Sequence, residues 1–149
     1  MSTDQVALTD AIVTAIETAV PSLPAHGTWK YVEPRELRAD KHAHWLVVYP
    51  TRLIPEIIST ESNYDNQFRF VVSWHANVFK GLESNVGDDV RAREALLEAQ
   101  AIRLEIEEWG AGLPGAGPND TAVLFQSDYG LERNGLWVAK HQIDVEIFE

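Results

Sequence analysis

Histidines are the side chains of this sequence best suited to bind a metal ion. His42 and His44 lie two positions apart, and His75 stands in a later apolar segment. Residues at i and i+2 of a strand point to the same face, which suits imidazole ligation of zinc. His42, however, falls in a charged turn and His44 begins a predicted strand, so histidines on a hydrated surface explain the pattern better. We therefore predict no metal site.

Nucleophilic catalysis has equally weak support. Ser73, His75 and Asp144 supply the residue types of a hydrolytic triad, but no nucleophile-elbow motif surrounds the serine. The chain has no cysteine, which excludes thiolate chemistry and disulfides. Residues 110–120 hold four glycines and two prolines, yet this segment follows a predicted helix and precedes a predicted strand. A phosphate-binding loop has the opposite order. We predict that the protein is not an enzyme and uses no cofactor.

Composition indicates an acidic globular protein. The 149 residues include 12 basic and 23 acidic side chains, for a net charge of −11. This charge repels nucleic-acid phosphates at long range, so any DNA contact should be non-adhesive. No stretch of about 20 apolar residues indicates a membrane span, and the first residues lack a signal-peptide pattern. We expect one domain over residues 1–149 that stays in the cytoplasm of the cell that makes it.

Hydrophobic periodicity predicts two helices and four strands. Apolar residues recur at helical spacing over 3–20 and 89–109, and the first helix presents Leu8, Ile12, Ile16 and Ala19 on one face. Residues 21–43 contain three prolines and read as an irregular connection, with room for a short strand at 29–32. The predicted strands are 44–49, 68–78, 121–128 and 136–148. The order α-β-β-α-β-β indicates an α+β fold, with both helices packed on the apolar face of a mostly antiparallel four-stranded sheet.

A long excursion separates the first two predicted strands. It runs from about Thr51 to Gln67, and Pro55 interrupts its apolar residues. Loops longer than about 12–15 residues without their own structure tend to be functional or disordered. We therefore expect this excursion to carry part of the function.

The whole pattern resembles the tail terminator, or tail-completion, proteins of long-tailed bacteriophages. An N-terminal helix precedes the segment Tyr-Val-Glu-Pro-Arg-Glu-Leu at 31–37, and a long hairpin leads to Arg-Phe-Val-Val-Ser-Trp at 69–74. A helix and a long terminal strand of alternating polarity follow. The resemblance covers nearly the whole chain through length, element order and hydrophobic pattern.

The resemblance implies a structural role in the virion. Such subunits form a ring, usually of six, that caps the tail tube, stops its polymerisation and presents a surface to head-completion proteins. DNA passes through without specific binding, no membrane or cofactor takes part, and assembly occurs in the host cytoplasm. On this basis we expect the excursion to reach a ring neighbour or the tube through Ile54, Ile57, Ile58 and Tyr64. Some of Glu56, Glu61 and Asp65 would then face the lumen.

Two other interpretations stay open. Another neck or tail-tube component of the same virion class has similar patterning. A small-molecule-binding or enzymatic α+β domain would instead need a polar cluster between the helices and the sheet. His141, the one inward-phased polar residue of the last strand, is the candidate for such a pocket, although a lone histidine there is more often a core residue. The apolar residues of the excursion could equally pack against their own domain.

Overall fold

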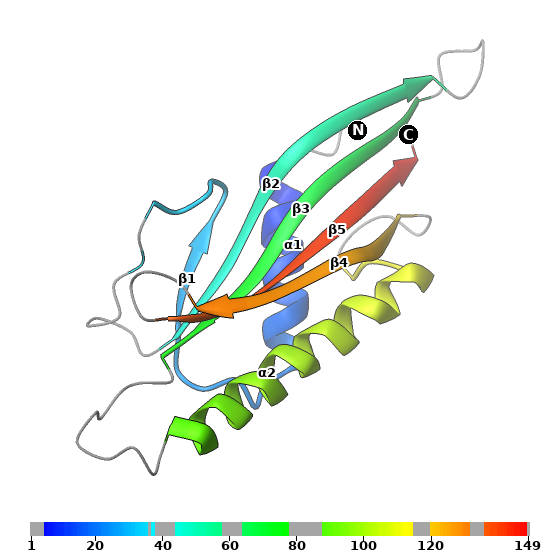
Figure 1. Ribbon diagram of the computed structural model, residues 1–149. Coiled ribbons are helices and arrows are strands. Elements are labelled where there is room, and N and C mark those ends of the chain that lie inside the picture. Colours follow the sequence, from blue (N-terminus) through cyan, green and yellow to red (C-terminus); the bar gives the residue numbers. More distant parts are fainter. Residues whose placement is uncertain are drawn as a thin grey trace.

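Two helices pack on one face of a five-stranded sheet in the computed structural model (Figure 1). The structure describes residues 5–35, 37, 44–57, 64–77, 88–114, 120–131 and 136–148. Helix α1 spans Gln5–Ala19, and α2 spans Asp88–Glu108 and continues into the short 3-10 helix η2, Trp109–Ala111. Pro21 follows α1, as expected for a residue that cannot donate to the preceding turn. The predicted α+β class is confirmed.

Among the described helices, none has both the length and the apolar character needed to cross a membrane.

The sheet has five strands in the order β1-β2-β3-β5-β4. They are β1 (Gly27–Lys30), β2 (His44–Ile57), β3 (Tyr64–Ala76), β4 (Thr121–Leu131) and β5 (Trp137–Phe148). β1 is parallel to β2, and every other pair is antiparallel. The prediction of four strands in the order α-β-β-α-β-β was therefore wrong in detail. It left β1 out of the strand count and gave it only as a possible short strand at 29–32, whereas the strand spans Gly27–Lys30 and pairs with β2.

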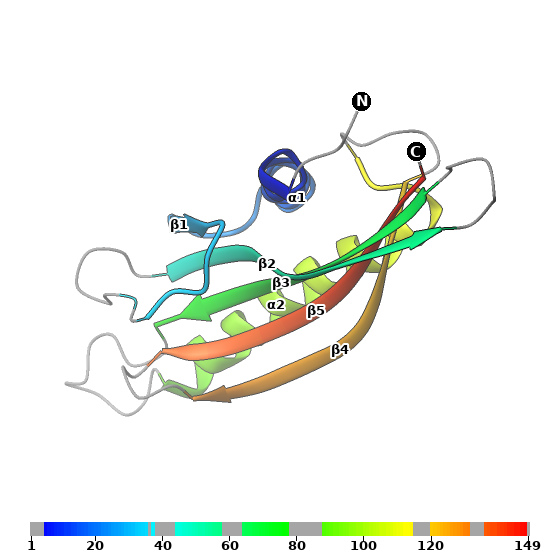
Figure 2. The same cartoon turned by 90° about the horizontal axis from the view of Figure 1, so that it is seen from above.

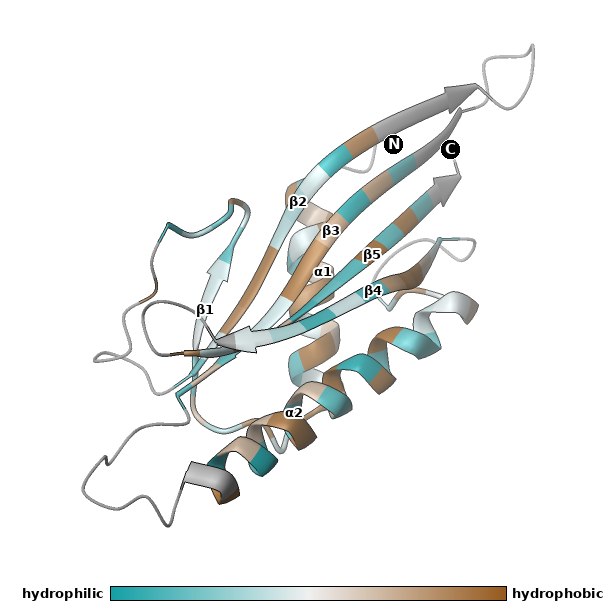
Figure 3. Ribbon diagram, viewed as in Figure 1, coloured by the Kyte–Doolittle hydropathy of each residue, from teal (hydrophilic) through white to brown (hydrophobic). Residues whose placement is uncertain are grey.

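The main core lies between the helices and one face of the sheet, which we call the helix face. Strand residues alternate between faces, and Figure 3 shows the resulting alternation of hydropathy along β5. Trp74 and Phe70 of β3 are the largest strand side chains buried there. The helices contribute Leu8, Ile12 and Ile16 from α1 and Ala95, Ala99, Ile102 and Ile106 from α2. Ala19, which we had placed on the buried stripe of the first helix, is exposed.

The opposite face of the sheet is only partly covered. Near β1 it holds a second cluster of buried side chains, with Trp45 packed against it: Leu37, Val47, Tyr49, Val71 and Leu136. Further along the strands the cover ends, and the charged side chains of Arg69 and Asp144 occupy the sheet surface half-buried. We call this uncovered part, marked by Arg69, Val123, Phe125 and Asp144, the bare face.

The excursion at 51–67 is mostly regular hairpin rather than loop. β2 continues to Ile57 and β3 already begins at Tyr64, and the two strands stay paired to their ends with one irregularity between Pro50 and Arg52. Pro50 and Pro55 suggested a break in the strand. β1, however, pairs only with Trp45–Val48, so both prolines lie where β2 is an edge strand, which tolerates a missing N–H donor. Figures 1 and 2 show this hairpin running past the helices.

Candidate functional site

The three residues of the hypothetical triad do not form one. Ser73 and His75 are both buried on the face opposite the helices, and the Ser73 Oγ lies 2.8 Å from the His75 Nε2. Burial, with a smaller effect from Lys140, lowers the pKa of His75 to about 4. Asp144 instead accepts two hydrogen bonds from Arg69, at 2.9 and 3.3 Å. The Ser–His pair therefore has no orienting carboxylate and no exposed serine.

The described residues also contain no group of three or more histidine or acidic side chains that could hold a metal ion. His44 stacks on Trp74, with ring centroids 5.4 Å apart and planes 8° apart. His42 lies outside the described residues. His44 and His75 point to opposite faces of the sheet.

His141 is a core histidine of the helix face. It is fully buried, and its Nδ1 lies 2.8 Å from the Ser127 Oγ. Burial is the main cause that lowers the pKa of His141 to about 4. A backbone hydrogen bond with Ala99 opposes this shift, and the positive charge of Arg103 adds to it. The imidazole is thus neutral near pH 7 and packs beside Tyr129. It does not line the groove described next.

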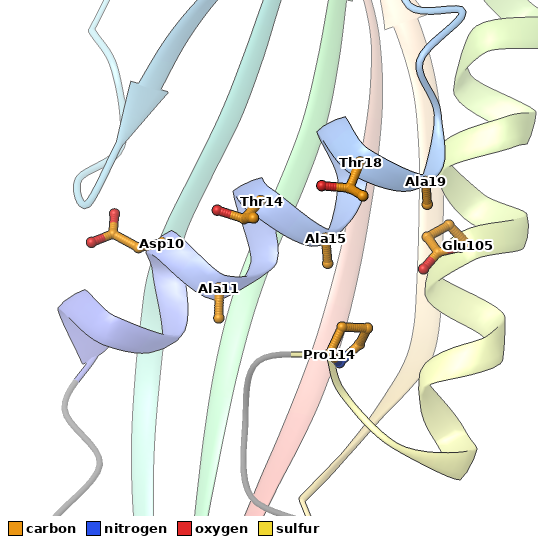
Figure 4. Close-up of a pocket in the computed structure, with 8 residues that line it drawn as sticks. All are labelled: Asp10, Ala11, Thr14, Ala15, Thr18, Ala19, Glu105 and Pro114. Atoms are coloured by element: carbon orange, nitrogen blue, oxygen red, sulfur yellow. The ribbon is translucent and has the colours of Figure 1, made fainter.

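A surface groove lies between α1 and α2 (Figure 4). It encloses about 440 Å³, and its floor is made of small side chains of α1. Two carboxylates, Asp10 and Glu105, lie along it, and Pro114 closes one side. The lining residues are Asp10, Ala11, Thr14, Ala15, Thr18, Ala19, Glu105 and Pro114. The groove has the size of a small-ligand site, but its two acids already have partners within the chain.

Asp10 ties α1 to the end of β1. Its Oδ1 accepts hydrogen bonds from the Tyr31 hydroxyl at 2.7 Å and from the Lys30 Nζ at 3.0 Å. The bond from Tyr31, followed by that from Lys30, lowers the pKa of Asp10. Tyr31 has a φ of +84°, which is unfavourable for a residue with a side chain, and its N–H donates to the Val48 carbonyl at 3.0 Å. Glu105 similarly accepts from the Trp109 indole at 3.0 Å. Both carboxylates therefore accept hydrogen bonds from other side chains of the same chain.

The end of the β2/β3 hairpin, which we call the arm (residues 51–57 and 64–69), carries most of the predicted assembly residues. Ile57 pairs with Tyr64, and the neighbouring Glu56 pairs with Asp65. Ile54 lies further back, opposite Gln67. Ile58 and Glu61 lie outside the described residues.

Two exposed apolar surfaces were missed by sequence reasoning. Val90, Leu97 and Leu104 of α2 are about half exposed, and Val123 and Phe125 of β4 are exposed on the bare face. A signal for the first was present, because three large apolar residues spaced by seven align on one side of a helix. The second carried no such signal, since it depends on which face of β4 the helices leave uncovered.

A scan against protein-family models found no matching family, and a search of the curated proteins found no similar sequence.

Proposed function

We propose that this chain is a ring-forming structural protein that works by binding further copies of itself. The observation that carries the proposal is the arm, because Phe68 is the one buried side chain among those that the structure describes there, whereas Arg52 and Leu53 are exposed. In the arm, Ile57 is paired with Tyr64, and the neighbouring Glu56 is paired with Asp65. Two carboxylates placed directly opposite each other destabilise an isolated hairpin, which is tolerable if the position serves an assembly.

Within that class, we propose a tail terminator of a long-tailed bacteriophage. The ring would cap the tail tube, stop its growth and receive the head-completion protein. In this proposal Ile54, Ile57, Ile58 and Tyr64 contact a ring neighbour or the tube protein, and Glu56, Glu61 and Asp65 contribute to an acidic lumen. An acidic lumen would let DNA pass without adhering. The support is the element order and hydrophobic pattern of the chain, together with the pairing of apolar and of acidic positions in the arm.

A small-molecule-binding function has one observation in its favour, the groove between α1 and α2. Its volume of about 440 Å³ is within the usual range for ligand pockets. The polar side chains described between the helices and the sheet do not line this groove: His141 packs against Ser127, and Glu98 accepts a hydrogen bond from the indole of Trp74. Another neck or tail-tube component would differ from a terminator in the proteins that it binds. A binding assay with the end of the tail tube therefore distinguishes these two functions.

The mass of the native protein over a range of concentrations tests the proposal. We expect a discrete oligomer near six times 16.7 kDa, and Ile57→Asp should abolish it by placing a charge in the contact. The matched control is Val6→Asp, which puts the same charge on an exposed apolar site of α1 and should leave the oligomer intact.

Two results would count against this proposal. A wild-type monomer at every concentration, also in the presence of tail tubes, would contradict the ring and favour the groove. A ring that survives Ile57→Asp would show that the arm is not its contact surface.

A further inference from the structure

An apolar stripe runs along the outer side of α2. Val90, Leu97 and Leu104 are 53%, 47% and 50% exposed. They are seven residues apart, which is close to two helical turns, so they line up on one side of the helix. The core residues Ala95, Ala99, Ile102 and Ile106 occupy the other side. The helix is therefore apolar on two sides, of which its own sheet buries only one.

A second uncovered apolar surface lies on the far side of the sheet. Val123 and Phe125 are 57% and 42% exposed. Ala122 and Leu124 of the same strand pack on the helix face, so Val123 points the other way. Phe125 lies under the guanidinium of Arg69, 4.3 Å from its carbon to the ring centroid, on this same side. One copy thus offers an unpartnered helix stripe and, across the sheet, an unpartnered strand surface.

We propose that α2 of one copy packs on the bare face of the next copy. The inference rests on the proposed ring and names a contact within it. A sheet face and the apolar stripe of a helix are the two surfaces that protein layers normally bury against each other. Because the two surfaces differ and belong to the same chain, the contact is heterologous. It repeats from copy to copy and closes into a ring if the rotation permits.

The dimensions of the two surfaces agree. The stripe from Val90 to Leu104 is roughly 21 Å long at 1.5 Å per residue. The last part of β5, from Gln142 to the end of the strand at Phe148, extends roughly 20 Å at about 3.3 Å per residue. A helix laid along these strands would place its whole stripe on the sheet.

The charges also agree. The exposed side of α2 includes Glu94, Glu107 and Glu108 and one arginine, Arg93, whereas the bare face and the adjoining arm carry Arg69 and the exposed Arg52. Asp144 on the same face is already paired with Arg69, which reduces its repulsion of the acidic helix. Glu146 also lies on this face, so its two arginines and two acids balance. In a protein of net charge −11, a charge-balanced surface repels an acidic helix less than the rest of the molecule does.

Mixing two blocked variants tests the contact. Leu97→Asp/Leu104→Asp removes the helix stripe, and Val123→Asp/Phe125→Asp removes the strand surface. We expect each variant alone to lose the wild-type oligomer. A one-to-one mixture should form a dimer of twice 16.7 kDa that grows no further, because each variant contributes the surface that the other lacks. Native mass spectrometry with one variant isotopically labelled identifies the mixed dimer.

Leu96→Asp is the matched control. Leu96 is as exposed as Leu97, at 49%, but lies roughly 100° around the helix from it. It should keep the oligomer, and unchanged circular dichroism should show that all variants fold. An oligomer that survives either double substitution, or a mixture that stays monomeric, would overturn the contact while leaving a ring through other surfaces standing.

A monomeric wild type would contradict the ring, and cross-linking would then decide the contact alone. Because the chain has no cysteine, Leu97→Cys in one population and Phe125→Cys in another can be joined by a short bismaleimide. A mixed product in excess of both homodimers supports the heterologous contact. Homodimers through position 97, or no product, overturn it.

Discussion

The two faces of the sheet differ in how far other parts of the chain cover them. On the helix face, β3 buries Phe70, Val72 and Trp74 in a core shared with both helices. On the other face, the same strand contributes Val71 to a small cluster and then Arg69 to a half-buried ion pair. One face is therefore filled along its length, whereas the other is filled at one end and open at the other.

This difference distinguishes buried residues, which stabilise the fold, from exposed residues of the bare face. Closing the helix face buries apolar area in every copy, which is the main source of stability. Val123 and Phe125 remain exposed on the other face, which is the surface that we propose another copy covers. Substitutions on the first face should thus unfold the protein, and substitutions on the second should change what it binds.

The largest effect on stability should come from neighbours on β3 that point to opposite faces. Phe70→Ala should lower the free energy of unfolding by about 3–5 kcal/mol, because a fully buried ring leaves a cavity. Val71→Ala, in the smaller cluster, removes two methyl groups and should cost about 2 kcal/mol. Denaturant titration of both variants gives the two values. Equal losses at the two positions would contradict the distinction between the faces.

The pH dependence of the free energy of unfolding should be an effect of intermediate size, and residues on both faces of the sheet should contribute to it. His75 and His141 lie on opposite sides of the sheet, and burial lowers the pKa of each from 6.5 to about 4. Between these values the unfolded chain binds protons that the folded chain does not. The contribution of each histidine to stability is therefore complete above about pH 6.5 and is lost as the pH falls toward 4. From pH 7 to pH 5 we expect a loss of about 2 kcal/mol per histidine.

Denaturant titrations at pH 7 and pH 5 measure this slope. Glu98 acts in the opposite direction, since burial raises its pKa to about 6 and the folded chain then holds a proton that the unfolded chain releases. The informative comparison is therefore with His75→Gln and His141→Gln, each of which should flatten the slope of the wild type by about the same amount. A slope unchanged in both variants would show that these imidazoles accept protons in the folded chain.

Sequence reasoning was most successful where one local pattern decides the structure. The alternation from Trp137 to Val145 placed β5 on the correct face, and the helical spacing located α2 within a residue or two. It did not give the correct bounds of β1 or the continuous strands of the arm. A four-residue strand, and a strand that contains two prolines, form only where a neighbouring strand pairs with them. The same distinction between local sequence and tertiary arrangement applies to the candidate site. Ile57 and Tyr64 were selected from local composition, but their direct pairing and the uncovered state of Phe125 depend on tertiary arrangement.

The smallest effect on the fold should come from the ion pair of the bare face. Arg69 donates to both oxygens of Asp144 and lies over Phe125, yet its side chain remains partly exposed to water, which weakens such pairs. Arg69→Ala should therefore change the denaturation midpoint less than Val71→Ala does, and added salt should reduce the change further. The same substitution should weaken self-association more clearly, because it removes a positive charge from the surface on which α2 is proposed to dock. A double-mutant cycle with Asp144→Ala, measured by denaturation and by oligomer dissociation, separates the two roles. If Arg69→Ala destabilised the fold as strongly as Phe70→Ala and left association unchanged, the bare face would belong to the core and the contrast between the two faces would fail.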